Sequence, residues 1–310
     1  MNKHIAILGG GPAGYVAASH AAAQGARVTL IDPQPLGGAC LHRGCIPTKT
    51  LVEVCNLLDK ARRAESYGLT PGGGIEADWP RLRDKAGQVI GMLGRGIDSL
   101  MADRKVTHIQ GAGRIVDGRT LSVEGIGLIH ADAVLISTGS SPIRPASMAV
   151  DGRRIATSDD LLRWDDLPRS LLIVGDGVVA CEFAFIMQTL GVQVSLAAMG
   201  ERPLPFLDHE IANVVAREMR KRGIDFLGHA AVERLQPGGE GVTAYVAGQP
   251  LASAGRALLA VGRRPNSAGL GLAEAGVRLG GRGEIVTDAH MRTNLDGLYA
   301  VGDVNGRLAL

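Results

Sequence analysis

The stretch that decides the fold is Ile5–Asp32, IAILGGGPAGYVAASHAAAQGARVTLID. It opens with a short apolar run, which is typical of a strand buried on both faces. A glycine-rich GxGxxG turn follows, and then an alanine-rich segment that favours helix and ends at Gly25. A second apolar run, Val28–Ile31, leads to Asp32. Strand, turn, helix, strand and acidic residue in this order predict a βαβ unit that binds a dinucleotide.

The turn and the acidic residue have separate roles in such a unit. Gly9 permits a tight turn, Gly11 lets the backbone approach a pyrophosphate, and Gly14 lets the helix pack on the strand. The helix N-terminus offers free N–H groups to the phosphates. Asp32 stands where a carboxylate accepts hydrogen bonds from a ribose hydroxyl. A glycine-rich turn without a ligand is the alternative, and the complete pattern in register argues against it.

The chain repeats this pattern once. Leu171–Ala198 aligns with the first stretch without a gap, with Gly175 and Gly177 on its first two glycines. Ala180 at the third glycine position is an accepted variant. Two units predict two nucleotides, one held tightly and one exchangeable. Because Ala198 replaces the ribose-binding carboxylate, the choice between NAD and NADP stays open, and the absence of a basic cluster leans to NAD.

A cysteine pair follows the first unit closely, in Gly37–Lys49, GGACLHRGCIPTK. A CxxxxC pair such as Cys40 and Cys45 is more often two unrelated buried thiols or half of a metal site. Here no second cysteine cluster completes a zinc site, so we predict no metal. A dithiol beside a bound dinucleotide is the arrangement needed to pass two electrons between a cofactor and a disulfide.

Together these residues resemble the flavoprotein disulfide reductases, the pyridine nucleotide–disulfide oxidoreductase family. The resemblance runs from Lys3 to Leu310 and includes three further motifs in the family's order, at Ser137–Ser140, Gly262–Asn266 and Tyr299–Asp303. The cysteine stretch looks most like that of the dihydrolipoyl (lipoamide) dehydrogenases. Glutathione and mercuric reductases are similar but usually carry a different residue pair between the cysteines.

The resemblance implies an α/β fold with two Rossmann-like domains, of which the NAD(P)-binding domain is inserted in the FAD-binding domain. It implies an FAD-binding domain at residues 1–142, an NAD(P)-binding domain at residues 143–262 and a return to the FAD-binding domain at residues 263–310. The family's C-terminal dimerisation domain, with its histidine–glutamate acid/base pair, would be absent. We therefore expect a fragment of a longer, homodimeric protein, and a truncated relative is the alternative.

The resemblance also implies roles for individual side chains. Cys45 would be the thiol nearer the flavin, and Cys40 the interchange thiol that attacks the substrate disulfide. Lys49 would place its ammonium near flavin N5, where negative charge develops. Glu182 would be its partner, because a buried lysine needs a carboxylate. Asp303 would accept a ribityl hydroxyl, and the helix beginning after it would point its positive end at the flavin.

Two sets of cofactor contacts follow from the same resemblance. FAD would contact Gly9, Gly11, Pro12, Ala13, Gly14, Asp32, Gly38, Ala39, Lys49, Gly113, Thr138, Gly139, Ser140, Asp303 and Ala309. NAD(P) would contact Gly175, Gly177, Val178, Val179, Glu182, Ala198, Val232 and Gly262. Electrons would pass from dihydrolipoamide, or a lipoyl domain, to the cysteine pair, to FAD and to NAD. The alternatives are a glutathione- or mercuric-type NADPH reductase and a partial FAD module without disulfide turnover.

Composition is that of an ordinary globular chain, with 45% hydrophobic and 21% charged residues. A net charge of +2 gives no reason to expect a nucleic-acid partner. No apolar run reaches the roughly 18 residues that a membrane span needs. The chain enters a strand almost at once, so we expect no targeting segment. Four cysteines, two of them redox-active, fit a reducing cytoplasm.

Several further elements are predicted from local pattern. Helices are expected at Leu51–Ala64 and Ala268–Val277, strands at Ala133–Ile136, Glu284–Asp288 and Gly297–Val301, and a loop at Pro71–Gly74. Cys55 and Cys181 are expected as core residues, and Arg263 and Arg264 as solvent-exposed charges.

Overall fold

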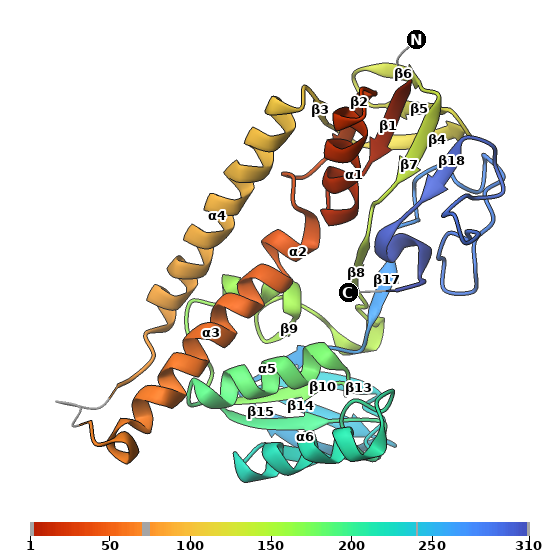
Figure 1. The fold of residues 1–310 in the computed structure, drawn as a ribbon. Coiled ribbons are helices and arrows are strands. Elements are labelled where there is room, and N and C mark those ends of the chain that lie inside the picture. The colour runs from red at the N-terminus through yellow and green to blue at the C-terminus, as the bar shows by residue number, and fades with distance from the viewer. Residues whose placement is uncertain (1–2, 70–74, 240, 309–310) are drawn as a thin grey trace. The chain divides into compact units, whose positions relative to one another are not determined.

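The computed structural model describes residues 3–69, 75–239 and 241–308. Its backbone contacts divide the chain into two compact units, whose elements are labelled in Figure 1. Unit 1 comprises Met1–Cys45, Val89–Ser141 and Arg263–Leu310, and unit 2 comprises Ile46–Gln88 and Pro142–Gly262. Neither unit is a single stretch of chain.

Unit 1 is built on a parallel sheet of five strands in the order β18-β7-β1-β2-β3. The strands are β1 (His4–Leu8), β2 (Arg27–Asp32), β3 (Thr107–Gln110), β7 (Ala133–Ile136) and β18 (Leu298–Ala300). In the centre, Ile5 of β1 pairs with Val28 on one side and with Ala133 on the other. The two strands of the first βαβ unit are therefore present as β1 and β2. The strands expected at 133–136 and 297–301 are present as β7 and β18.

Alternating side chains give this sheet two buried faces. Ile7 packs with residues of α1 (Pro12–Ala23) and of the second half of α4 (Trp79–Asp103). Its neighbour Leu8 packs on the opposite face with a small antiparallel sheet. That sheet consists of β4 (Gly113–Asp117), β5 (Thr120–Val123) and β6 (Gly127–His130).

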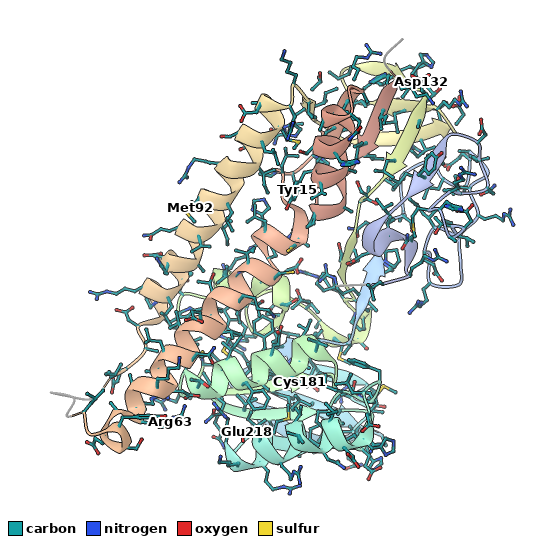
Figure 2. The ribbon with its side chains drawn as sticks, in the orientation of Figure 1. Tyr15, Arg63, Met92, Asp132, Cys181 and Glu218 are labelled. Atoms are coloured by element: carbon teal, nitrogen blue, oxygen red, sulfur yellow. The ribbon has the colours of Figure 1, made fainter. Side chains whose placement is uncertain are left out.

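Unit 2 repeats this plan with a second parallel sheet, in the order β12-β11-β10-β16-β9. The strands are β9 (Ile155–Thr157), β10 (Ser170–Val174), β11 (Gln193–Ala197), β12 (Asp225–Leu227) and β16 (Arg256–Leu259). Ile173 belongs to the core on the side of α5 (Val178–Thr189) and α6 (His209–Lys221). Figure 2 labels Cys181 on α5 and Glu218 on α6.

The other face of the second sheet carries a different layer. Leu172 packs with an antiparallel sheet of three strands. These strands are β13 (Arg234–Gly238), β14 (Gly241–Val246) and β15 (Gln249–Ala254). Helix α3 (Cys45–Arg62) adds Leu51 and Cys55 to the core shared with α5, together with Trp79. For this reason residues 46–88, which the sequence analysis placed in the FAD-binding domain, group with unit 2.

The remaining elements are short. They are α2 (Gly38–His42), the strand pair β8 (Ser140–Pro142) and β17 (Arg263–Pro265), and the 3₁₀ turns η1 (Ala64–Tyr67), η2 (Ala146–Met148), η3 (Ser158–Arg163) and η4 (Gly302–Asn305). None of the helices in the described part of the chain combines the length and apolar character needed to cross a bilayer.

Two local predictions are wrong. The segment expected as a helix at 268–277 forms turns, because Gly269, Gly271 and Gly276 adopt φ values of 76°, 75° and 77°, which interrupt a right-handed helix. The strand expected at 284–288 is reduced to one isolated bridge between Ile285 and Leu279. The helix expected from Leu51 begins earlier, at Cys45. The loop predicted at 71–74 lies outside the described residues.

Candidate active site

The first glycine turn connects β1 to α1 in unit 1. Gly9 has a φ of 109°, and a Cβ atom there would lie 2.4 Å from the Ser137 carbonyl oxygen, so the position requires glycine. Gly11 caps α1 without any side-chain hydrogen bond, and Pro12 begins the helix. The first N–H groups of α1 are therefore open to an anion, and the predicted contacts Ala13 and Gly14 lie in this same turn.

Asp32 closes this turn from the end of β2. Its carboxylate accepts hydrogen bonds from the backbone N–H groups of Gly10, at 2.5 Å, and Gln34, at 2.7 Å. The two contacts hold the carboxylate beside the glycine turn, where an adenosine ribose would lie. These residues fit one dinucleotide at the carboxyl end of the unit 1 sheet.

The cysteine-bearing segment packs directly on this glycine turn. The Gly37 N–H donates to the Gly10 carbonyl at 2.8 Å. A Cβ atom on Gly38 would lie only 2.6 Å from the Gly11 Cα atom, so the two backbones touch with no side chain between them. Helix α2, which carries Ala39 and Cys40, starts from this contact.

Cys40 and Cys45 are both free, half-buried thiols. Cys45 is the first residue of α3. Burial, a hydrogen bond with the Cys45 side chain and the charge of Cys45 raise the pKa of Cys40 to about 11, whereas the Cys45 backbone N–H stabilises the Cys40 thiolate. Cys45 is thus close enough to Cys40 to perturb its thiol, and such proximity is what a disulfide-forming pair needs.

Lys49 and Glu182 form a salt bridge within unit 2. Lys49 lies four residues after Cys45 in α3, and Glu182 lies in the first half of α5. The expected ion pair is therefore present, but its setting differs from the expectation of a buried lysine: the Lys49 side chain is 61% exposed and that of Glu182 is 30% exposed. An ion pair this accessible orients the two side chains and contributes little to stability.

Asp303 belongs to a polar network in unit 1. It accepts a hydrogen bond from the Ser140 hydroxyl. Arg263 donates to the same hydroxyl and to the Ser140 carbonyl, both at 2.7 Å, and its Nε lies 4.0 Å from an Asp303 oxygen. The prediction that Arg263 is simply solvated is therefore wrong. Its motif, Gly262–Asn266, was the signal that could have identified it.

The turn at Thr138 and Gly139 is fastened by another residue of that motif. Asn266 donates from its side chain to the Thr138 carbonyl at 2.9 Å and from its backbone to the Gly139 carbonyl at 2.9 Å. The Thr138 hydroxyl donates back to the Asn266 carbonyl at 2.7 Å. The threonine–glycine turn is thus fixed by side chains that the local sequence does not connect to it.

The second glycine turn, in unit 2, reproduces the geometry of the first. Gly175 has a φ of 134°, and a Cβ atom there would lie 2.3 Å from the Ala260 carbonyl oxygen. Gly177 caps α5 without a side-chain hydrogen bond, so the first N–H groups of this helix are open to an anion. Val178, the first residue of the helix, is 52% exposed. These residues fit a second dinucleotide.

The other predicted contacts are distributed more widely. Ala198 is fully buried, with its N–H bonded to the Leu227 carbonyl and its carbonyl to the Ala230 N–H. Gly113 is buried beside Leu8 in unit 1. Val232 packs against the core under β14, and Gly262 accepts from Ile143. Ala309 lies outside the described residues.

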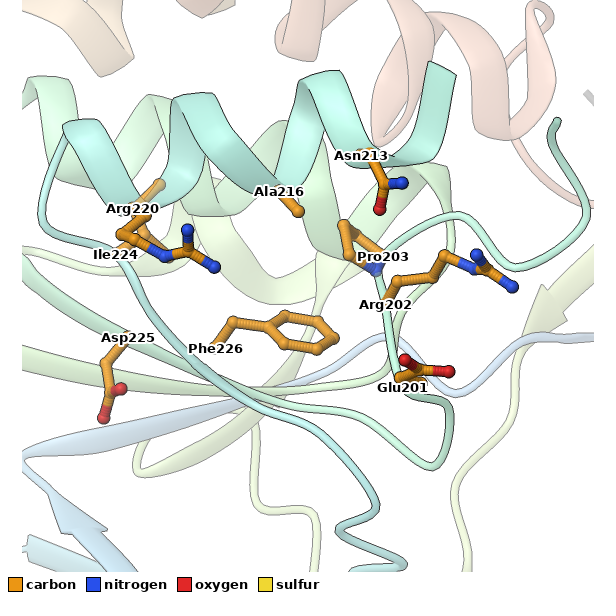
Figure 3. A pocket seen from close by; sticks show the side chains of 9 residues that line it. All are labelled: Glu201, Arg202, Pro203, Asn213, Ala216, Arg220, Ile224, Asp225 and Phe226. Atoms are coloured by element: carbon orange, nitrogen blue, oxygen red, sulfur yellow. The ribbon is translucent and has the colours of Figure 1, made fainter. Parts of the chain in front are cut away.

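Unit 2 also contains a pocket of about 370 Å³ between α6 and the segment that follows β11. Figure 3 shows the Phe226 ring lying between α6 and residues 201–203. The pocket is lined by Glu201, Arg202, Pro203, Asn213, Ala216, Arg220, Ile224, Asp225 and Phe226. Two acidic and two basic side chains are among these residues. Within the described residues no group of histidine, cysteine and acidic side chains is arranged to hold a metal ion.

Comparison with known proteins agrees with this geometry. Residues 3–310 match the family described as pyridine nucleotide-disulphide oxidoreductase. The chain is 38% identical to a dihydrolipoyl dehydrogenase of Bacillus subtilis, covering 99% of this chain and 68% of that protein. Among solved structures, LpdA from Mycobacterium tuberculosis aligns with a TM-score of 0.92 at 31% identity, over 99% of this chain and 69% of that one.

A second solved structure is similar. The HOCl-induced flavoprotein disulfide reductase RclA from Escherichia coli aligns with a TM-score of 0.87 at 29% identity, over 99% of this chain and 67% of that one. The chain thus spans about two thirds of the length of these relatives.

Proposed function

The chain belongs to the pyridine nucleotide-disulphide oxidoreductase family, and on that premise we propose that it passes two electrons between a substrate dithiol, the Cys40–Cys45 pair, FAD and NAD(P). The observation that carries the proposal is the contact of Gly37 and Gly38 with the first glycine turn. This contact joins a close pair of thiols to a site shaped for a dinucleotide.

In this proposal the first site holds FAD. Gly9, Gly11 and the open N-terminus of α1 would receive the pyrophosphate, and Asp32 would bind the adenosine ribose. Asp303, held by Ser140 and Arg263, would accept a hydrogen bond from a hydroxyl of the ribityl chain. The bound flavin would supply the ability to move an electron pair between the thiols and the nicotinamide.

The cysteines would perform thiol–disulfide exchange. A substrate thiolate attacks the Cys40 sulfur of the oxidised pair, the Cys40–Cys45 bond breaks, and Cys45 leaves as a thiolate. The second substrate thiolate then attacks the sulfur joined to Cys40, which closes the substrate disulfide and leaves both cysteines reduced. The substrate is oxidised by two electrons, and its two protons pass to solvent or to a base. Lys49, oriented by Glu182, would add positive charge one helical turn after Cys45.

A lipoyl-type dithiol is the substrate class that we favour. The support comes from the cysteine stretch and from the dihydrolipoyl dehydrogenases among the relatives. We further propose that the whole protein is a homodimer. We also propose that it works in the cytoplasm, because its exchange chemistry requires that the thiols can be reduced. A general flavoprotein disulfide reductase is the second candidate, which the likeness to RclA favours.

The experiment is a single-turnover reduction, which does not depend on regions found only in longer relatives. Protein reconstituted with FAD is mixed with dihydrolipoamide without oxygen, and flavin absorbance is followed before and after addition of NAD⁺. We expect the dithiol to reduce the flavin and NAD⁺ to reoxidise it. Cys40→Ser and Cys45→Ser should abolish reduction by the dithiol but not by dithionite.

The matched control is Cys55→Ala, which removes a buried thiol outside the pair and should leave the reduction intact. Reduction by dihydrolipoamide that survives Cys45→Ser would contradict the proposed electron path. A parallel series with glutathione disulfide and NADPH separates the lipoyl-type substrate from the other candidate.

A further inference from the structure

The two glycine turns differ in where they carry a carboxylate. In the first turn, Gly10 lies between the first two glycines and Asp32 ends the second strand. In the second turn the corresponding positions hold Asp176 and Ala198. The acidic residue has exchanged places across the turn, from the end of the strand to the glycine turn itself.

In both turns a carboxylate hydrogen-bonds between the glycine turn and the chain at the end of the second strand or just after it. At the first site an Asp32 oxygen accepts from the Gly10 N–H, which links the strand end to the turn. At the second site Asp176 Oδ2 accepts from the Gly200 N–H at 3.3 Å, which links the turn to the loop that follows β11 in the opposite direction. A Cβ atom would lie 3.3 Å from the carboxylate oxygen at Gly10 in one case and at Gly200 in the other.

Asp176 is also held firmly by its own backbone. Its carbonyl accepts from the Leu204 N–H at 2.7 Å and from the Cys181 thiol at 3.9 Å. The side chain is half-buried and lies between Gly175 and Gly177, next to the open N-terminus of α5. Ala198, in contrast, is fully buried and has no polar side chain to offer a ribose.

We propose that Asp176 recognises the ribose of the second nucleotide and makes NAD, rather than NADP, the coenzyme. The proposal rests on the proposed function, since it assigns the second site to a nicotinamide nucleotide. A carboxylate can accept hydrogen bonds from the ribose hydroxyls of NAD, whereas it repels the 2′-phosphate of NADP.

The basic side chains near the strand end do not offset this carboxylate. Arg202 contacts His209 at 2.8 Å and lines the neighbouring pocket together with Glu201. Arg220 lines the same pocket with Asp225. Neither Asp176 nor the second glycine turn is among the residues that line this pocket, so we assign the discrimination against a second phosphate to the charge of Asp176.

The test measures binding rather than activity. Calorimetric titration of the FAD-loaded chain with NADH and with NADPH gives two dissociation constants for each variant. We expect the wild type to bind NADH more than about tenfold tighter than NADPH, since a hydrogen bond to a charged group contributes about 1.5–3 kcal/mol. Asp176→Asn keeps an oxygen for the Gly200 N–H but removes the charge, so it should reduce this preference about tenfold or more.

Two further variants make the result specific. Asp176→Gly places the residue of the first turn in the second one and should reduce the preference in the same way. Asp225→Asn removes an exposed carboxylate from the adjacent strand β12 and should leave the preference unchanged.

The outcomes separate the two proposals. A wild type that prefers NADPH would overturn the assignment of Asp176, and so would variants that weaken NADH and NADPH equally, because a purely structural residue affects both. A wild-type chain that holds FAD but binds neither nucleotide would overturn the proposed function, and the coenzyme assignment with it.

Discussion

Cys45, the first residue of α3, raises the pKa of Cys40 in α2 through its side chain and its charge, in addition to the effect of burial. Contact with the Cys45 backbone N–H lowers this pKa, and contact with the Cys45 side chain raises it. The first contact favours the Cys40 thiolate, whereas burial and the second contact disfavour it more strongly. In the reduced protein Cys40 therefore keeps its proton well above neutral pH.

Replacing Cys45 should lower the pKa of Cys40. Cys45→Ala removes a side-chain hydrogen bond and a charge that raise this pKa, but not the burial, so the value should fall from about 11 and remain above its ordinary value of 9.0. The measurement is the pH dependence of Cys40 alkylation, followed by mass spectrometry. Cys55→Ala is the control and should not move the profile; an unchanged profile in Cys45→Ala would refute the contact.

Substitution of the first turn glycine should prevent flavin binding. In Gly9→Ala the new Cβ atom meets the Ser137 carbonyl at 2.4 Å, so the turn must open and the pyrophosphate contacts are lost. Gly25→Ala is a matched control, because Gly25 also has a positive φ, 85°, but open space around it. It should cost about 1–2 kcal/mol of stability and retain flavin. Equal flavin content in both variants, measured by absorbance, would exclude this explanation.

Loss of the Arg263 guanidinium should weaken flavin binding without unfolding the chain. Arg263→Gln removes the hydrogen bonds that hold Ser140 beside Asp303, so we expect about tenfold weaker flavin affinity. Arg264→Gln changes the exposed neighbouring residue and should have no effect. The comparison is made by fluorescence titration with FAD, and similar affinities in the two variants would argue against the role assigned to Arg263.

Both glycine turns could be predicted because their constraints are local. Gly9 and Gly175 each need a positive φ immediately after a buried strand, and that requirement appears directly as a glycine at a fixed spacing. The cysteine segment, Gly37–Lys49, could be predicted for the same reason, since Cys40, Cys45 and Lys49 are close in sequence. The pairing of Lys49 with Glu182 required the family resemblance.

The features that were not predicted depend on contacts between residues far apart in the sequence, which no local sequence pattern indicates. Arg263 meets Ser140 from a distant part of the chain, so its motif, Gly262–Asn266, could mark the residue but could not identify its partner. Helix α4 was not predicted as an element, because it contains Gly87, Gly91, Gly94 and Gly96, which disfavour helix. Packing of its second half against the unit 1 core stabilises the helix despite these glycines.

Stability should fall at alkaline pH through Cys181. Burial, with smaller contributions from Asp176 and Glu182, raises the pKa of Cys181 to about 12 from an ordinary value of 9.0. The folded state thus holds this proton more tightly than the unfolded state, so the stabilisation is complete below pH 9 and is lost as pH rises towards 12. Each unit of pKa difference corresponds to about 1.4 kcal/mol.

The measurement is urea unfolding of wild type and Cys181→Ala below pH 9 and between pH 9 and 12. The wild type should lose more unfolding free energy over this interval than the variant, because only the wild type has the thiol to ionise. Parallel pH profiles for the two proteins would contradict the assignment.

The position of β18 at the edge of the unit 1 sheet has a consequence for biosynthesis. Leu298 of β18 pairs with Val134 of β7, so this sheet lacks its edge strand until residues 298–300 have left the ribosome. The parallel sheet of unit 2 is complete once β16 has emerged, about forty residues earlier. Unit 2 of the nascent protein can therefore mature first, while unit 1 waits with an open sheet edge that chaperones would need to protect.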